Sequence, residues 1–183
     1  KGWLGNNINI PELGRNGNLY MAPQDAFTEE IWVYNDMIAD LGFELPAFGD
    51  SYTVDEWVAI GKAAKAKGLD GLMFGPVESW CVLDGFANFV NQQNDDYPTD
   101  VLGLAYDGKI TWDQPMFRDA LQAYKTLHDN GVWRADSLSM DYQVQAWGKW
   151  LDREGVGIYC NGDWFISSAP AEYNTADSLG ITM

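Results

Sequence analysis

The sequence predicts an α/β domain, in which short buried strands alternate with longer helices. Apolar runs rich in β-branched and aromatic residues, such as 31–34, 71–74 and 157–160, are typical of buried strands. The segments between them place apolar residues at helical spacing over roughly 10 to 17 residues. This alternation favours a layered structure in which helices pack on a central sheet.

Helix ends in the first half are marked by capping and turn residues. Thr53 followed by Glu56 forms a capping box that starts a helix, and Gly68 is suited to end it. Asn35 is a candidate N-cap for a short helix that Gly42 ends. The expected elements are strands at 18–23, 31–34 and 71–74 and helices at 35–41, 54–67 and 78–91.

The second half begins with a turn-rich segment, 94–111, in which Asp107 and Gly108 predict the tip of a small hairpin. Asp113 as N-cap and Pro115 in the first turn predict a helix that runs to Asn130. The remaining expected elements are a helix from Ser139 or Asp141 to about Glu154, a helix from Asp163 to about Ala171, and a strand at 179–183.

The stretch 157–165 is the most informative part of the chain. A strand that ends at Asn161–Gly162, a pair suited to a sharp turn, is followed by Asp163 as the N-cap of a helix. This order places Trp164 at the mouth of the sheet, where α/β folds bind ligands. The indole ring is then either an exposed stacking surface or a packing contact with the helix that follows.

The composition disfavours several classes of partner. A net charge of −16 would repel both nucleic acid and anionic membranes. Nine Trp and nine Tyr among 183 residues fit a site that stacks on sugars or apolar ligands. The chain has no apolar run of about 18 residues, the length needed to span a membrane. Lys1, in place of an initiator Met, indicates a chain processed or excised from a longer protein.

Few residues suit a metal ion or a redox pair. Cys81 and Cys160 lie 79 positions apart, which excludes a local CxxC motif, and two separate buried thiols are favoured over a disulfide. The one histidine, His128, falls near the end of a predicted helix, where a cation is favourable. We therefore expect neither a metal site nor a cofactor.

Six short motifs follow one another along the chain. They are Leu19–Pro23, Trp32–Asp36, Tyr52–Trp57, Gly71–Phe74, Phe117–Val132 and Gly155–Trp164. In this order they resemble the family 1 extracellular solute-binding proteins of ABC importers, the group that contains maltose-binding protein. The resemblance covers nearly the whole chain. It implies a periplasmic-binding-protein type II-like lobe, with a central mixed sheet flanked by helices.

The resemblance also implies how the chain is divided. Proteins of this family have two lobes that close on a ligand, and only one of the two is substantially present here. Residues 1–23 would be an N-terminal segment and crossing strand from a missing first lobe. Residues 24–183 would be the second lobe, incomplete at its end.

The function implied by the resemblance is capture of a carbohydrate, an oligosaccharide, between the two lobes and its delivery to the permease subunits of the importer. No chemistry is performed on the ligand. The protein would be a monomer on the extracellular face of a bacterial membrane or in the periplasm. It would touch the membrane only through a lipid anchor that lies outside this sequence.

Six residues are candidates for ligand binding on these grounds: Trp164, Trp80, Glu78, Asp163, Asn161 and Gln24. The resemblance implies that the two tryptophans stack on sugar rings. The carboxylates and amides suit hydrogen bonds with hydroxyl groups. Helix capping is the alternative role for Glu78 and Asp163. We expect no catalytic residue.

Two other classes of function stay open. A glycosidase fragment would need two facing carboxylates, one with a raised pKa, and among 27 acidic residues such pairs occur by chance. A calcium-stabilised module is suggested by Asn94–Asp96 and Asp107–Gly108, but these lack the ligand spacing of a calcium loop, so solvated turns are favoured. The sequence has no nucleophile motif and no phosphate loop.

Overall fold

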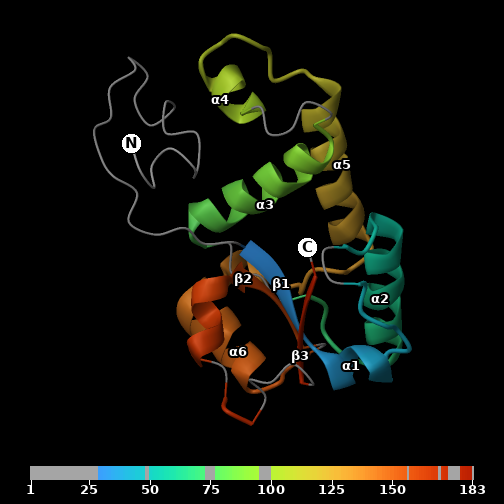
Figure 1. Cartoon of the computed structure of the whole chain (residues 1–183). Helices are drawn as coiled ribbons and strands as arrows, with labels where there is room; N and C mark the ends of the chain where they lie inside the picture. Colours follow the sequence, from blue (N-terminus) through green and yellow to red (C-terminus); the bar gives the residue numbers. More distant parts are fainter. Residues whose placement is uncertain are drawn as a thin grey trace.

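The computed structural model describes residues 29–47, 50–72, 77–94, 100–155, 157–168, 170–172 and 178–182. Within these residues a small sheet with flanking helices lies below a group of three helices (Figure 1). The strand predicted at 18–23 lies outside the described residues. None of the described helices is long and apolar enough to cross a membrane.

The sheet is built around one central strand. It has the order β2-β1-β3, and its strands are β1 (Glu29–Tyr34), β2 (Ile158–Gly162) and β3 (Leu179–Thr182). Both neighbours run antiparallel to β1, so that Ile31 lies opposite Cys160 on one side and Thr182 on the other. The strands predicted at 31–34, 157–160 and 179–183 are therefore confirmed in outline.

The mixed sheet that the resemblance implies is not observed among the described residues. The strand predicted at 71–74 is reduced to one parallel bridge between Leu72 and Trp133, and residues 73–76 lie outside the described part. The Leu72 N–H donates to the Val132 carbonyl, and the Arg134 N–H donates to the Leu72 carbonyl. This pair of bonds holds the segment without extending a ladder, so the described sheet is wholly antiparallel.

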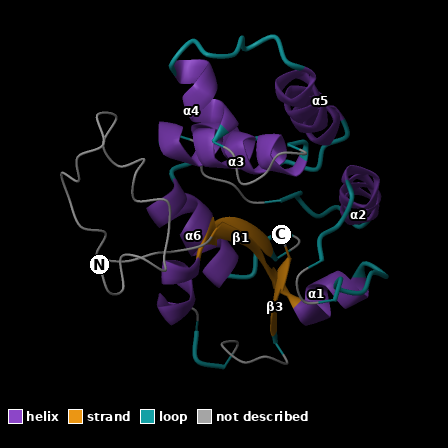
Figure 2. Ribbon diagram, turned by 45° about the horizontal axis from the view of Figure 1, so that its top comes forward, coloured by secondary structure: helices purple, strands orange, loops and turns teal. Residues whose placement is uncertain are grey.

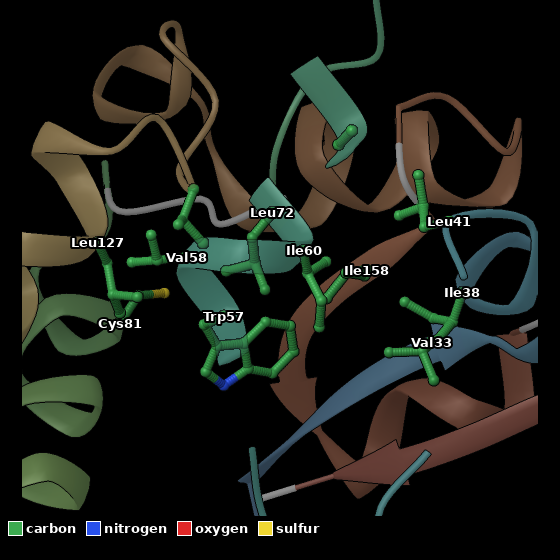
Figure 3. Close-up of a cluster of buried hydrophobic side chains, with 12 residues drawn as sticks. Val33, Ile38, Leu41, Trp57, Val58, Ile60, Leu72, Cys81, Leu127 and Ile158 are labelled. Carbon is green, nitrogen blue, oxygen red and sulfur yellow. The ribbon is translucent and has the colours of Figure 1, made fainter. Parts of the chain in front are cut away.

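The central strand divides the core between its two faces, because successive side chains of a strand point in opposite directions. Val33 belongs to one core cluster with Ile38 of α1 (Asn35–Asp40) and Ile60 of α2 (Val54–Ala66) (Figure 3). Trp32 and Tyr34 belong to a second cluster. Its other buried members are Met140, Ala146, Trp150 and Leu179. Both faces of the sheet are therefore covered, which fits the apolar character of β1.

The first two helices begin and end near the predicted residues. They are α1 (Asn35–Asp40) and α2 (Val54–Ala66). The capping box is confirmed: the Thr53 hydroxyl accepts from the Glu56 N–H, and the Glu56 carboxylate accepts from the Thr53 N–H. The cap predicted at Asn35 is wrong, because Tyr34, the last residue of β1, occupies the N-cap position and the strand leads directly into the helix.

The upper group consists of α3 (Ser79–Gln92), α4 (Val101–Tyr106) and α5 (Pro115–Asp129), which Figure 2 shows together on one side of the sheet. Their shared core contains Val90, Val101, Ala105, Phe117 and Ala120. Pro115 opens α5 as predicted, but Gln114 rather than Asp113 is its N-cap.

The hairpin predicted at Asp107–Gly108 is wrong. The Asp100 carboxylate accepts from the Gly103 N–H and so caps α4, which ends where Gly108 adopts a positive φ of 70°. Asp–Gly pairs suit the left-handed turn after a helix as well as a hairpin, and here the cap at Asp100 selects the helix.

The chain after α5 departs most from the predicted elements. A short 3₁₀ turn, η3 (Ser137–Ser139), precedes a π-helical turn, η4 (Tyr142–Ala146), which Asp141 caps. Helix α6 (Trp147–Leu151) then ends before Glu154, since Arg153, Gly155 and Gly157 all have positive φ. Cys81 and Cys160 are two separate thiols, the first buried and the second partly buried.

The segment that follows corrects the predicted turn at Asn161–Gly162. Asn161 pairs with Glu30 and Gly162 with Glu29, so strand pairing with β1 carries β2 through both residues. A 3₁₀ helix, η5 (Asp163–Ser168), takes the place of the α-helix predicted to about Ala171.

Candidate functional site

Three aromatic side chains from separate segments meet at the first turn of α3. The Trp80 ring lies 4.8 Å from the Tyr142 ring and 6.1 Å from the Trp164 ring, measured between centroids. Both pairs meet edge to face, with interplanar angles of 83° and 60°. All three side chains are partly buried. We call Trp80, Tyr142 and Trp164 the aromatic cluster.

Backbone hydrogen bonds join the segments that carry Trp80 and Tyr142. The Val77 N–H donates to the Met140 carbonyl over 3.3 Å. The Glu78 carboxylate accepts from the Tyr142 N–H over 3.2 Å. These bonds fix the start of α3 against the start of η4, so the two rings are held by their backbones as well as by each other.

Trp164 is positioned by the glycine two residues before it. Its six-membered ring lies so close to the Cα of Gly162 that a Cβ at this position would overlap with the ring. Trp164 also packs against the cluster that contains Trp32 and Trp150. Of the two roles predicted for Trp164, the structure shows the packing contact, and the residue as a whole is partly buried.

The polar candidates differ in their surroundings. Glu78 is half-buried and occupies the N-cap position of α3, but it makes no side-chain cap bond within that helix. Asp163 is exposed in the first turn of η5. Asn161 is only 4% exposed, and its side-chain oxygen accepts from the Gly162 N–H over 2.8 Å. Gln24 lies outside the described residues.

The environment of Tyr142 keeps its phenol protonated. Burial raises the pKa of Tyr142, and electrostatic interactions with Cys81 and Glu78 raise it further. The hydroxyl group therefore stays a hydrogen-bond donor throughout the physiological range. Glu78, Asp141 and Asp163 make this region acidic.

No group of three or more potential metal ligands is found in the described parts of the chain. Arg134, a buried cation eight residues before Tyr142, does not take part in the aromatic cluster. Its guanidinium pairs with Asp136 at 2.9 Å and with Asp70 at 3.1 Å, so it ties together loops outside the aromatic cluster. The site thus consists of aromatic rings with carboxylates beside them, an arrangement suited to binding a neutral polar ligand.

The structure brings together three of the six predicted residues: Trp80 and Trp164 lie in the aromatic cluster, and Glu78 bonds to the Tyr142 N–H. Asp163 is exposed and precedes Trp164 in the chain. Tyr142 was missed. Its only sequence signal was its place after Asp141, a candidate helix cap, and nothing in the sequence shows that this turn faces α3.

Comparison with known proteins identifies the fold. No family model matches the chain, nor does any curated protein. Among solved structures, a chitin oligosaccharide binding protein is similar, with a TM-score of 0.74 and 19% identity over 96% of this chain and 42% of its own. A probable secreted solute-binding lipoprotein from Streptomyces coelicolor matches with a TM-score of 0.72 and 14% identity, over 92% of this chain and 39% of its own.

A family 1 extracellular solute-binding protein from Bifidobacterium longum subsp. infantis is also similar, with a TM-score of 0.67 and 16% identity, over 95% of this chain and 43% of its own. The chain thus spans about two-fifths of the length of the structures it matches. It has the fold of one part of the family 1 extracellular solute-binding proteins, which confirms the structural resemblance indicated by the sequence motifs.

Proposed function

We propose that this chain is part of the substrate-capture subunit of an ABC importer and that it binds a carbohydrate at the aromatic cluster. The observation that carries the proposal is the convergence of Trp80, Tyr142 and Trp164 from three distant segments. This convergence occurs on a fold shared with a protein named for binding chitin oligosaccharides.

The chemistry of the cluster suits a sugar ring. The C–H faces of a sugar pack on aromatic rings, and such a contact is worth about 0.5–1.5 kcal/mol beyond the area it buries, by analogy with aromatic pairs. The protonated Tyr142 hydroxyl and the Glu78 and Asp163 carboxylates supply donors and acceptors for sugar hydroxyls. Three rings offer more than one stacking face, which favours an oligosaccharide over a single sugar.

The wider role follows from the same fold. Residues 24–183 would form one lobe and residues 1–23 would lead into it from the other, and the rest of the clamp would supply the opposite wall of the site. Closure of the two lobes would present the loaded form to the permease subunits. The matched structures described as secreted and extracellular support a position outside the cytoplasm, with a lipid anchor as the only membrane contact.

A glycosidase is the rival proposal, and the carboxyl groups whose pKa values are shifted do not favour it. A general acid of this class needs a carboxyl group whose pKa is raised. Hydrogen bonds from Thr53, Lys125 and Arg134 instead lower the pKa values of Glu56, Asp129 and Asp136, respectively. The similar structures are described as binding proteins, and we propose binding without chemistry on this basis.

The test is a sugar titration followed through the tryptophan indole N–H signals of the ¹⁵N-labelled chain. A single lobe makes only part of the contacts of a clamp, so the method must detect millimolar affinity. Xylo-, malto- and chito-oligosaccharides are the probes. We expect one class to shift the Trp80 and Trp164 signals, with Trp80→Ala and Trp164→Ala each weakening binding about tenfold, equivalent to about 1.4 kcal/mol.

Trp133→Ala is the matched control, because Trp133 is also partly buried and its ring stacks on Tyr124, with 5.8 Å between the centroids. It should leave the affinity unchanged. Titrations that move neither the Trp80 nor the Trp164 signal would refute the proposal. Recovery of a shortened oligosaccharide after the titration would support the rival proposal that the chain is part of a glycosidase.

A further inference from the structure

Two aromatic side chains are exposed at the end of α4 and on the loop that leads from it to α5, a loop at the top of the molecule in Figure 1. Tyr106 is 70% exposed and Trp112 is 48% exposed. Their rings meet edge to face, with centroids 5.6 Å apart and an interplanar angle of 82°. These two solvent-exposed rings stand at nearly a right angle to each other and form an open corner. We call Tyr106 and Trp112 the aromatic corner.

The aromatic corner rests on a rigid base. The Trp112 ring lies 5.0 Å from the ring of Phe117, which is buried in the core of the upper helices. Tyr106 is the last residue of α4, and the turn after it is closed by a bond from the Lys109 N–H to the Leu104 carbonyl over 2.9 Å. Binding here would therefore order few additional side chains, which lowers its entropic cost.

Positively charged, negatively charged and neutral polar side chains lie close to the two rings in the chain. Lys109 pairs with Asp107 at 3.3 Å, and Arg118 pairs with Asp113 at 3.5 Å. The Gln114 amide donates to the Thr111 hydroxyl over 3.3 Å. Amide, hydroxyl and paired charged groups beside an aromatic face suit a ligand with many hydroxyl groups and no net charge.

The size of the patch decides between a small ligand and another protein surface. The two rings expose on the order of 250 Å² together. A stable protein interface needs about 800 Å² from each partner, of which about 57%, or roughly 450 Å², is apolar. The corner is therefore too small for a second copy of the chain and matches the face of one or two sugar rings.

We propose that Tyr106 and Trp112 form a second saccharide-binding site, which holds a neutral polysaccharide or oligosaccharide chain at the molecular surface. It is separate from the aromatic cluster, because Phe86, which packs against Phe117, lies about 9 Å beyond Trp80 along α3. Such a contact raises the local concentration of saccharide around the protein. It does not depend on the function proposed for the aromatic cluster.

The test is electrophoresis of the whole chain in native gels that contain glucomannan, arabinoxylan or amylopectin. We expect at least one of these neutral polysaccharides to retard the wild-type chain. Tyr106→Ala and Trp112→Ala should each remove most of the retardation. Leu138→Ala is the matched control, because Leu138 is 75% exposed and lies outside the corner, and it should migrate like the wild type in every gel.

Further measurements distinguish a loss of binding at the aromatic corner from unfolding of the variant and from binding at the aromatic cluster. Tyr106→Ala removes a mostly exposed ring and should leave the melting temperature nearly unchanged, so it stays informative if Trp112→Ala unfolds. A double variant of Trp80 and Trp164 to Ala should retain the retardation. The inference is overturned if no gel retards the wild type, if Tyr106→Ala is still retarded, or if the double variant alone loses it. Sedimentation that shows a dimer dependent on Trp112 would also overturn it, in favour of a second copy.

Discussion

The part of the molecule that contains the sheet and the group of upper helices are held together in different ways. The sheet joins residues far apart in the chain, such as Ile31 and Cys160, through a backbone register. The upper helices α3, α4 and α5 follow one another directly and share a core of apolar side chains. The first part depends on directional, long-range contacts, and the second on local helix formation and on packing without fixed direction.

The contrast is sharpest around Trp150. Its ring stacks on Tyr34 at 4.2 Å, its indole N–H donates to the Gly157 carbonyl, and its own carbonyl accepts from the Tyr34 hydroxyl. The Arg153 guanidinium lies 4.4 Å from the centre of the Tyr34 ring. The core around Phe117 consists of apolar side chains that pack together. In the aromatic cluster, Trp80 comes from the upper helices and Trp164 from the segment after β2. The cluster therefore depends on both parts of the molecule.

The largest expected effect is that of Trp150→Ala. Trp150 is completely buried, and its loss removes a stacked ring together with a hydrogen bond to the backbone. We expect the free energy of unfolding to fall by about 4–5 kcal/mol, measured by urea denaturation. Hydrogen exchange should show lost protection in β1 and β2, while α5 stays protected. Equal loss in α5 would contradict the separation of the two parts.

Phe117→Ala is the corresponding change in the upper helices, with an expected cost of about 3–4 kcal/mol. Phe117 is buried and contacts Phe86 and Trp112. Hydrogen exchange should now report opening of α3, α4 and α5 with β1 still protected. If the strands exchange as fast as the helices, the chain behaves as one cooperative unit and the comparison fails.

Gly162→Ala should have a smaller effect on stability, about 1–3 kcal/mol, because its Cβ must displace the Trp164 ring. The indole signal of Trp164 should shift. The matched control is Gly148→Ala, where nothing lies within 4 Å of the added carbon and α6 is regular. It should be neutral or stabilising by about 0.5–1 kcal/mol. An unmoved Trp164 signal in Gly162→Ala would show that Gly162 does not position the ring.

The smallest expected effect concerns acid stability. A hydrogen bond from Arg134 lowers the pKa of Asp136. A carboxyl group whose pKa is lowered in the folded state stabilises the fold at pH values above its pKa in the unfolded chain, which is about 3.9. This stabilisation is lost as the pH falls through the pKa of the group in the folded state. Asp136 is half exposed, so we expect less than about 1 kcal/mol. Asp136→Asn should flatten the decline in stability below pH ~4, and an unchanged pH profile would contradict the assignment.

Local rules predicted the ends of several elements. The capping box at Thr53, Gly68 after α2 and Pro115 at the start of α5 all lie where the sequence placed them, because each depends on residues within one helical turn. Asp107–Gly108 shows the limit of such rules. The pair fits two kinds of turn, and the cap at Asp100 decides between them.

The candidate site was predictable in part. Trp164 and Trp80 were found because each follows a predicted strand or turn, a local pattern. Tyr142 was not found, since its place beside Trp80 depends on how η4 packs against α3. Asn161 was expected in a sharp turn but pairs with Glu30, so its side chain is buried in the sheet rather than presented at a loop tip.

The sequence by itself determined the start of α2 at its capping box, the start of α5 at Pro115, the apolar run of β1 and the order of motifs that resembles solute-binding proteins, because these properties depend on neighbouring residues and their spacing. The tertiary structure decided the antiparallel pairing of the sheet, the π-helical turn at Tyr142 and the meeting of three aromatic rings. These depend on contacts between residues more than 60 positions apart, such as Glu78 and Tyr142, for which no local pattern specifies the partner.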